Sequence, residues 1–208
     1  TGVVSRGYKR KTSGFILSDE KSTPDQIGDE PYQIKRKFPD VVLAVDEKRV
    51  RAIEKLSNEG SYRPEVFVLD DAYQHRAVKA RTSIVLVDYN RPTFKDHLMP
   101  LGKLRDLPER ISAADIIIVS KCPANLNAWE KCQWSEALGL KGYNAADHFG
   151  HRKDGRKQYI FFTKITYDTA LPVFPEGDAR YLYAKRLILF SGIANDTPLR
   201  HYLSSTYK

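Results

Sequence analysis

Short apolar runs recur along this sequence and give the first indication of its fold. Four of them have the length of a strand and are rich in β-branched residues: residues 41–45, 66–69, 83–87 and 116–119. Polar and apolar positions hardly alternate within these runs, which is typical of strands covered by helices on both faces. The pattern therefore predicts an α/β fold, with a mainly parallel sheet flanked by helices. The connection between residues 69 and 83 is short for a helical crossover, so an antiparallel neighbour remains an alternative there.

Helices are predicted between and after these strands. Residues 46–49 open a helix in which apolar residues follow at three-residue spacing. Residues 123–140 are expected to form another helix, and a further one is expected to start near Thr197. Residues 142–157 are polar, rich in Gly and His, and without periodicity, so we interpret them as a loop or an insertion.

The length of the chain suits one α/β domain and the start of another. We expect a main domain at residues 1–158, a strand linker at 159–185 and the beginning of a smaller second α/β domain at 186–208. One apolar run in the linker and one in the second unit (186–192) each predict a strand. The chain opens on Thr1 rather than Met and stops inside an apparent helix, so we expect both ends to be cut.

The charge of the chain narrows the classes of partner. Lys and Arg total 34 against 26 acidic residues, which gives a formal net charge of +8. Such an excess suits nucleic acid, an anionic membrane surface or a phosphorylated substrate. No predicted helix has a dense Lys/Arg face interleaved with aromatic residues, which argues against nucleic acid. No apolar run approaches the roughly 18 residues of a membrane-spanning helix, so we expect this piece to be soluble.

Two acidic residues directly follow one of the predicted strands. Asp70 and Asp71 come after the run 66–69, so their carboxylates are expected at the carboxyl edge of the sheet, where open α/β sheets bind ligands. In P-loop enzymes a carboxylate at this edge helps to hold the Mg²⁺ that bridges nucleotide phosphates. A strand that ends at a polar turn is the alternative. Gln74 and His75 follow closely and would place an amide and an imidazole near the same edge.

A second acidic pair precedes a proline. Pro31 suits the first position of a helix, so Glu30 is expected to be the cap of that helix and Asp29 to lie just ahead of it. An Asp carboxylate can also accept the proton of a sugar hydroxyl that attacks a γ-phosphate. From the residues alone, helix capping is the simpler interpretation.

Three arginines lie in or beside predicted loops. Arg6 shares a Gly-containing turn with Tyr8, Arg49 lies near the start of a helix, and Arg105 precedes Asp106 in a loop. Isolated arginines are usually solvated surface groups. Several of them near one edge of a sheet could instead neutralise phosphates.

Taken in order, these segments resemble the tetraacyldisaccharide 4′-kinase family of lipid A synthesis. Each segment is weak alone, whereas their shared order is specific, and the resemblance covers nearly the whole chain, being weakest over residues 124–158. The segments are 5–8 (Ser-Arg-Gly-Tyr), 28–31 (Gly-Asp-Glu-Pro), 46–49 (Asp-Glu-Lys-Arg), 70–71 (Asp-Asp), 74–75 (Gln-His), 100–105 (Pro-Leu-Gly-Lys-Leu-Arg), 114–115 (Ala-Asp) and 190–195 (Phe-Ser-Gly-Ile-Ala-Asn).

The resemblance implies a P-loop-NTPase-like enzyme that uses ATP and Mg²⁺. Such an enzyme phosphorylates the 4′ hydroxyl of an acylated glucosamine disaccharide 1-phosphate, the tetraacyldisaccharide 1-phosphate, to give lipid IVA. The resemblance also implies a peripheral position on the anionic cytoplasmic face of the bacterial inner membrane. Neither nucleic acid nor an obligate protein partner is expected.

The same resemblance implies roles for single residues. Asp29 would be the general base at the 4′ hydroxyl, with Asp71 and His75 as further catalytic residues, and Asp70 and Asp71 would hold Mg²⁺. Contacts to the nucleotide or the lipid substrate are implied for Arg6, Tyr8, Glu30, Arg49, Gln74, Arg105 and Asp106.

The sequence departs from the family pattern at four points. The Gly-rich phosphate loop G-x-x-x-x-G-K-S/T does not occur, nor does the Pro-Asp-His-His-like stretch with the His partner of the catalytic Asp. Ala72 replaces a usual Gly, and Asp106 stands where Glu is usual. Phosphoryl transfer depends on positioning and charge neutralisation. We therefore expect the 208-residue piece to be inactive by itself and the complete protein to be active.

Two other functions remain alternatives. A non-catalytic, basic α/β module could bind anionic lipid, which the net charge permits. Another P-loop small-molecule kinase would share the predicted fold, and only the resemblance argues against it.

Overall fold

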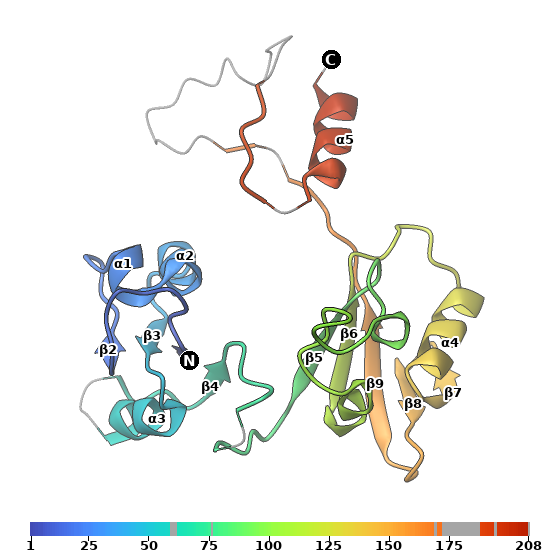
Figure 1. The fold of residues 1–208 in the computed structure, drawn as a ribbon, viewed down its shortest axis with the longest axis horizontal. Helices are drawn as coiled ribbons and strands as arrows, with labels where there is room; N and C mark the ends of the chain where they lie inside the picture. The colour runs from blue at the N-terminus through green and yellow to red at the C-terminus, as the bar shows by residue number, and fades with distance from the viewer. Residues whose placement is uncertain (59–61, 76, 169, 172–187, 194, 208) are drawn as a thin grey trace.

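The strands of the computed structural model form two sheets, each with its own helices (Figure 1). The structure describes residues 1–58, 62–75, 77–168, 170–171, 188–193 and 195–207. Within these ranges the first sheet has the strand order β2–β3–β1–β4, and the second has the order β5–β6–β9–β8–β7. The predicted α/β class is confirmed, although the strands are divided between two sheets instead of one.

Three parallel strands form most of the first sheet. β1 (Gly2–Ser5) lies between β3 (Val42–Val45) and β4 (Phe67–Leu69) and is parallel to both, and β2 (Ile16–Leu17) adds an antiparallel edge. Because β1, β3 and β4 run in one direction, their carboxyl ends meet at one edge of the sheet.

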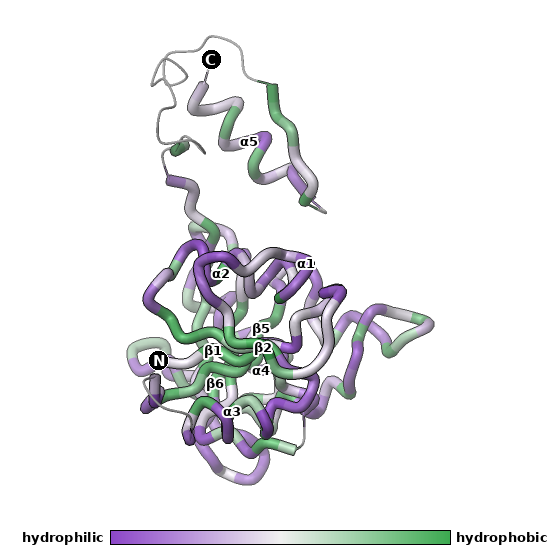
Figure 2. Tube along the Cα trace, turned by 90° about the vertical axis from the view of Figure 1, so that its left-hand side faces the viewer, coloured by the Kyte–Doolittle hydropathy of each residue, from purple (hydrophilic) through white to green (hydrophobic). Residues whose placement is uncertain are grey.

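Helices cover both faces of this sheet. On one face Val3 and Leu43 pack with Ile27 of α1 (Pro24–Ile27) and with side chains of α2 (Asp29–Lys37). On the other face Val4 packs with Leu56 of α3 (Arg49–Asn58). Successive residues of a strand point to opposite faces, which explains why neighbouring valines belong to different cores. Figure 2 shows the strands β1 and β6 as hydrophobic and much of the surrounding chain as hydrophilic.

The second sheet is mixed. Its parallel part consists of β5 (Ile84–Asp88), β6 (Ile116–Ser120) and β9 (Lys157–Phe162). Side chains of these strands form one core with the segment around α4 (Ala128–Ala137) and the 3₁₀ helix η3 (Pro108–Ala113). A shorter 3₁₀ helix, η2 (Thr93–Lys95), precedes η3. The predicted helix within residues 123–140 is thus confirmed, with α4 shorter than expected.

The expectation of a loop at residues 142–157 is wrong. β7 (Lys141–Asn144) and β8 (Phe149–His151) form an antiparallel hairpin, and β8 continues the sheet beside β9. The ring of Phe149 meets that of Tyr159 on β9 edge-on, with the ring centroids 6.4 Å apart. Strands of three and four residues are too short for a clear alternation of polar and apolar positions, which is why the periodicity was missing.

The expectation that helices cover both faces of every strand is also wrong for two strands. β4 and β5 each form an end of their sheet, and within the described residues they do not pair with each other. Val68 of β4 is 50% exposed and Leu86 of β5 is 69% exposed. The antiparallel pairing considered for the 69–83 connection is therefore not present.

The C-terminal part is described only in pieces. α5 (Thr197–Thr206) confirms the helix expected near Thr197, and Tyr202 on it stacks on Tyr167 with ring centroids 4.8 Å apart. Residues 188–190 of the expected strand 186–192 are not assigned to a strand, and residues 186–187 lie outside the described part. Residues 172–187 lie outside the described part, so the division at 158 and 185 stays a prediction, although β9 at the start of the expected linker belongs to the second sheet.

None of the helices in the described ranges combines the length and the apolar composition needed to cross a bilayer.

Candidate functional site

The carboxyl edge of the first sheet brings three polar residues together. The backbone N–H of Asp46, just after β3, donates to the carbonyl oxygen of Ser5 at 3.0 Å, and that of Asp70, just after β4, donates to Val4 at 3.1 Å. The Ser5 hydroxyl donates to Oδ2 of Asp70 at 3.2 Å. Asp70 therefore lies at the sheet edge where the sequence predicts it.

Arg49 fixes the turn that follows β4. Its guanidinium is buried and donates from Nη2 to the carbonyl oxygens of Asp70 and Asp71, each at 3.4 Å. Burial lowers the pKa of Arg49, and the positive charge of Arg6 lowers it further, against the opposing effect of nearby carboxylates that include Asp71 and Asp70. A guanidinium keeps its charge even so. The backbone between the two acids is thus held by a cation, and a second cation, Arg6, is within electrostatic reach.

Arg105 binds the second acid of the pair. It donates from Nη2 to Oδ1 of Asp71 at 3.0 Å and from Nη1 to Oδ2 at 3.3 Å. The two side chains are 65% and 61% exposed. The hydrogen bonds raise the pKa of Arg105. A loop from beside the second sheet therefore reaches the acidic pair of the first.

The loop after β1 lies against the start of α2. A Cβ built on Gly28 would lie 3.0 Å from the carbonyl oxygen of Tyr8 and 3.1 Å from Cα of Gly7, and Gly28 has a φ of +92°. Both the contact and the backbone angle require glycine at this place. Asp29, the next residue, is therefore held beside the loop that carries Arg6 and Tyr8, whose side chains are exposed.

The expected capping role of the acids before Pro31 is wrong. α2 begins at Asp29 and has Gly28 as its N-cap, so Asp29 and Glu30 lie within the first turn, and Pro31 is its third residue. Proline is tolerated there because first-turn N–H groups have no partner within the helix. Neither acidic side chain has a hydrogen bond or an ion pair among the described residues.

Helix α3 also begins differently from the prediction. Its first residue is Arg49, and Asp46 precedes the helix instead of lying in it. Asp46 is fully buried and accepts two hydrogen bonds of 2.7 Å from Arg51 and one of 2.8 Å from the N–H of Lys48. Burial raises the pKa of Asp46, but these donors outweigh the effect and the net pKa is lowered.

Gln74, Arg105 and Asp106 line a cavity of about 230 Å³. Tyr73 closes part of it and donates from its hydroxyl to the carbonyl oxygen of Arg110 at 2.5 Å. Asp106 forms an ion pair with Arg110 at 3.2 Å. A larger cavity of about 360 Å³, between η3 and the end of α4, contains none of the predicted site residues.

His75 forms no hydrogen bond or ion pair with the predicted acids in the part of the chain that the structure describes. Its Nε2 is buried without a hydrogen-bond partner among the described residues. Its backbone N–H donates to Ala72 at 2.8 Å.

The residues at the sheet edge include one carboxylate that suits a magnesium ion. Mg²⁺ in nucleotide enzymes is bound by one or two carboxylates, with phosphates and water as the other ligands. Oδ1 of Asp70 accepts no hydrogen bond within the described ranges, and the Ser5 hydroxyl lies beside the same carboxylate. Both oxygens of Asp71 are bound by Arg105 in this structure. Asp70 is therefore the better of the two predicted ligands.

Comparison with known proteins gives the family. The family profile described as tetraacyldisaccharide-1-P 4′-kinase, LpxK, matches residues 1–207. The chain belongs to this family.

Relatives in the LpxK family include two named tetraacyldisaccharide 4′-kinase. The protein of Parabacteroides distasonis is 42% identical over 204 residues, covering 95% of this chain and 51% of the relative. The protein of Porphyromonas gingivalis is 45% identical over 194 residues, covering 93% and 50%. The chain thus spans about half the length of the curated relatives it matches.

A solved structure is also similar. It is the crystal structure of the "apo" form of LpxK from Aquifex aeolicus in complex with ATP, with a TM-score of 0.51 and 34% identity, covering 57% of this chain and 38% of that one.

Sequence reasoning gave no role to Ser5, and it treated Asp46 only as the start of a helix. One signal was available for Asp46: it follows a strand directly, as Asp70 does. For Ser5 the sequence carries no comparable signal, because its role depends on the pairing of β1 with β4.

Proposed function

We propose that the protein containing this chain transfers the γ-phosphate of ATP to the 4′ hydroxyl of tetraacyldisaccharide 1-phosphate and so forms lipid IVA. Membership of the LpxK family and the names of the relatives support this reaction. The similar structure from Aquifex aeolicus is named as a complex with ATP, which supports ATP as the phosphate donor.

One observation carries the proposal: the loop after β1 borders both acidic elements. Ser5 at its start binds the carboxylate of Asp70. Gly7 and Tyr8 lie against Gly28, the residue before Asp29. A carboxylate suited to a metal and a carboxylate suited to proton transfer therefore both adjoin residues 5–8 of the chain, and phosphoryl transfer requires its reacting groups to be held close together in this way.

Asp29 would accept the proton of the attacking 4′ hydroxyl. Its side chain is exposed and has no partner among the described residues, so a substrate hydroxyl can approach it. The first turn of α2 also places its carboxylate near the positive end of the helix dipole. Proton transfer by a positioned side chain contributes about 10²- to 10⁴-fold to rate.

Asp70 would hold Mg²⁺, which neutralises charge on the nucleotide phosphates when bound. Arg6 and Arg49 supply further positive charge at the same edge, Arg49 as a buried group that also fixes the Asp70–Asp71 backbone. Arg105 is exposed and, among the residues that the structure describes, is bound only to Asp71, so it is the cation best placed to exchange its partner for a phosphate. We assign Tyr8, Glu30, Gln74 and Asp106 to substrate contact on the resemblance alone.

The substrate would be met at a membrane surface. We propose peripheral attachment to the cytoplasmic face of the inner membrane, supported by the net charge of +8. Each Lys or Arg close to an anionic surface contributes about 1 kcal/mol to attachment.

The test of this function uses the protein expressed from its complete reading frame. The purified protein is incubated with ATP, Mg²⁺ and tetraacyldisaccharide 1-phosphate in detergent micelles, and the lipid product is analysed by mass spectrometry and ³¹P NMR. We expect one added phosphate, at the 4′ position. Transfer to a water-soluble sugar but not to the lipid would favour another small-molecule kinase, and lipid binding without any ATP turnover would favour a non-catalytic module. Either result would contradict the proposal.

A further inference from the structure

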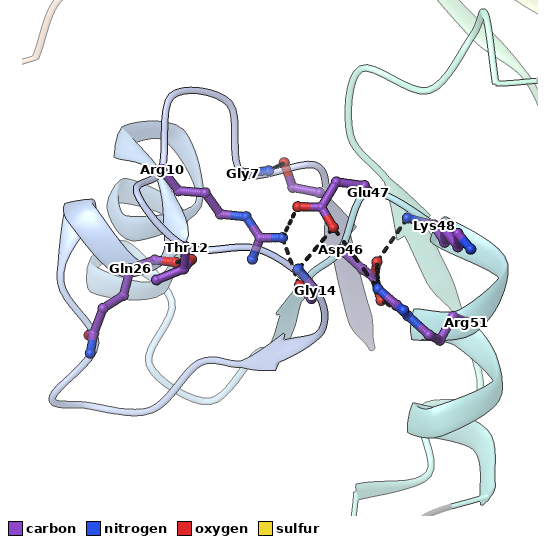
Figure 3. A network of polar contacts seen from close by, with 10 residues as sticks. Gly7, Arg10, Thr12, Gly14, Gln26, Asp46, Glu47, Lys48 and Arg51 are labelled. Atoms are coloured by element: carbon purple, nitrogen blue, oxygen red, sulfur yellow. Dashed lines mark hydrogen bonds and ion pairs between the residues drawn. The ribbon is translucent and has the colours of Figure 1, made fainter.

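A buried arginine links the loop after β1 to the turn before α3. The side chain of Arg10 is only 2% exposed and lies between Gly14 and Glu47, as Figure 3 shows. Its Nη2 donates to the carbonyl oxygen of Gly14 at 2.7 Å and forms an ion pair with Oε1 of Glu47. The other carboxylate oxygen, Oε2 of Glu47, accepts from the N–H of Gly14 at 3.0 Å. One carboxylate and one guanidinium thus close the loop between residues 10 and 14.

The stem of the same arginine supports the tight turn above it. A Cβ built on Gly7 would lie 2.7 Å from Cδ of Arg10 and 2.7 Å from the carbonyl oxygen of Ile27. Gly7 is therefore enclosed between the Arg10 side chain and the end of α1. Movement of Arg10 would release the contact that keeps the Arg6–Tyr8 turn close to Gly28 and Asp29.

The contacts of Arg10 indicate that it positions the loop and adds little to the stability of the fold. Its Nε and Nη1 are buried without hydrogen-bond partners among the described residues. Unpaired buried donors of a charged group carry a desolvation penalty that offsets much of the gain from an ion pair. If Arg10 contributed only to the stability of the fold, an apolar side chain of similar volume could take its place with little loss of stability.

We propose that Arg10 and Glu47 form a positioning pair that holds the Arg6–Tyr8 turn in register with Asp29. This inference rests on the proposed function, because the turn and Asp29 are taken to act on one substrate. Neither Arg10 nor Glu47 touches the reacting atoms; they act through the loop. The ion pair joins two segments that each border a carboxyl end of the first sheet, β1 and β3.

The experiment compares Arg10→Met, Glu47→Gln and the double variant in the protein from its complete reading frame, at a temperature where circular dichroism shows all of them folded. We expect kcat to fall by about 10- to 100-fold in each single variant, since small misplacements of reacting groups have effects of this size. The fall in kcat should exceed any rise in KM for ATP, because the pair positions the turn and does not itself contact the nucleotide. The double variant should lose no more than the worse single variant, since both changes break one link.

Lys11→Met is the matched control. Lys11 lies in the same loop and pairs with Asp25 at 2.7 Å, but both side chains are largely exposed. We expect its kcat to stay within about twofold of the unmodified protein. Hydrogen exchange supplies a second measurement: amides 7–14 should exchange faster in Arg10→Met and not in Lys11→Met.

Three results separate the possible failures. If the unmodified protein transfers no phosphate to the lipid, the proposed function fails, and the exchange measurement alone judges the pair. If the unmodified protein does transfer phosphate, and Arg10→Met keeps its kcat while amides 7–14 stay protected, the proposal of a positioning pair is wrong. A loss of kcat in which the two single changes multiply in the double variant would also overturn it, because two independent roles would then be required.

Discussion

The hydroxyl of Ser5 donates a hydrogen bond of 3.2 Å to the carboxylate of Asp70. Ser5 ends β1 and Asp70 follows β4, so this contact exists only because the two strands are parallel neighbours. It occupies Oδ2 and orients the carboxylate, and it leaves Oδ1 for another ligand.

Asp70→Asn should raise the Mg²⁺ concentration that gives half-maximal activity. Replacement of one carboxylate oxygen by an amide removes the negative charge that attracts the ion, and we expect an increase of about tenfold or more. The measurement is a Mg²⁺ titration of activity at saturating ATP. Asp71→Asn is the matched comparison, since Arg105 binds both oxygens of Asp71. An equal or larger shift for Asp71→Asn would contradict the assignment of the metal to Asp70.

Arg105→Met should change activity far more than stability. The Arg105–Asp71 pair is exposed, and exposed pairs contribute less than about 1 kcal/mol to the free energy of unfolding. If Arg105 exchanges Asp71 for a substrate phosphate, KM for one of the two substrates should rise by about tenfold. Urea unfolding and steady-state kinetics on the same variant check both parts. A large loss of stability with unchanged KM would make the pair structural.

Asp46→Asn should destabilise the protein at neutral pH, and this destabilisation should disappear in acid. Asp46 is buried, and its pKa in the folded protein is below the ordinary value of 3.8. A carboxyl group whose pKa is lowered by folding stabilises the fold when the pH is above its ordinary pKa. This stabilisation disappears as the pH falls through the lowered pKa of the folded protein. We expect Asp46→Asn to cost about 2 kcal/mol near pH 7, and the difference from the unmodified protein to shrink steadily below about pH 4. Urea unfolding across this range is the measurement, and a pH-independent difference would contradict the account.

Gln158→Ala should destabilise the second sheet. The Gln158 side chain is 1% exposed and donates to the carbonyl oxygens of Ile111 at 2.8 Å and Ala114 at 2.6 Å. Removal of the amide loses two buried hydrogen bonds, although Ile111 keeps the N–H of Ala114 at 3.1 Å and Ala114 keeps Nη2 of Arg152 as a donor, so the change costs about 1–3 kcal/mol. Lys141→Ala, an exposed change in the same sheet, should stay within about 0.5 kcal/mol. Equal unfolding midpoints for the two variants in urea would show that another donor replaces Gln158.

The sequence predicted β3, β4, β5, β6 and β9, because each coincides with an apolar run of about its own length. The runs at 41–45 and 116–119 became β3 and β6 almost residue for residue. The hairpin of β7 and β8 was missed because its stability depends on contacts with β9, including the ring of Tyr159. Tertiary contacts of this kind leave no local pattern.

The sequence predicted only part of the candidate site, because the rest also depends on tertiary contacts. Asp70 and Asp71 follow a strand, so their place at the sheet edge could be inferred from sequence order. The approach of Gly28 to Gly7 could not, because it depends on how α1 and α2 pack on one face of the sheet. The start of α2 was misplaced by two residues, since Pro31 is equally acceptable at any position in the first turn.

The most direct test of the central claim is the turnover number of Asp29→Asn in the protein from its complete reading frame, measured with ATP and the lipid acceptor. Asp40→Asn is its control, because Asp40 is an exposed acid just beyond the other end of the same helix. The account predicts that kcat falls by about 10²- to 10⁴-fold for Asp29→Asn, with ATP affinity within about threefold and with unchanged folding. A kcat for Asp29→Asn as high as that of Asp40→Asn would contradict it.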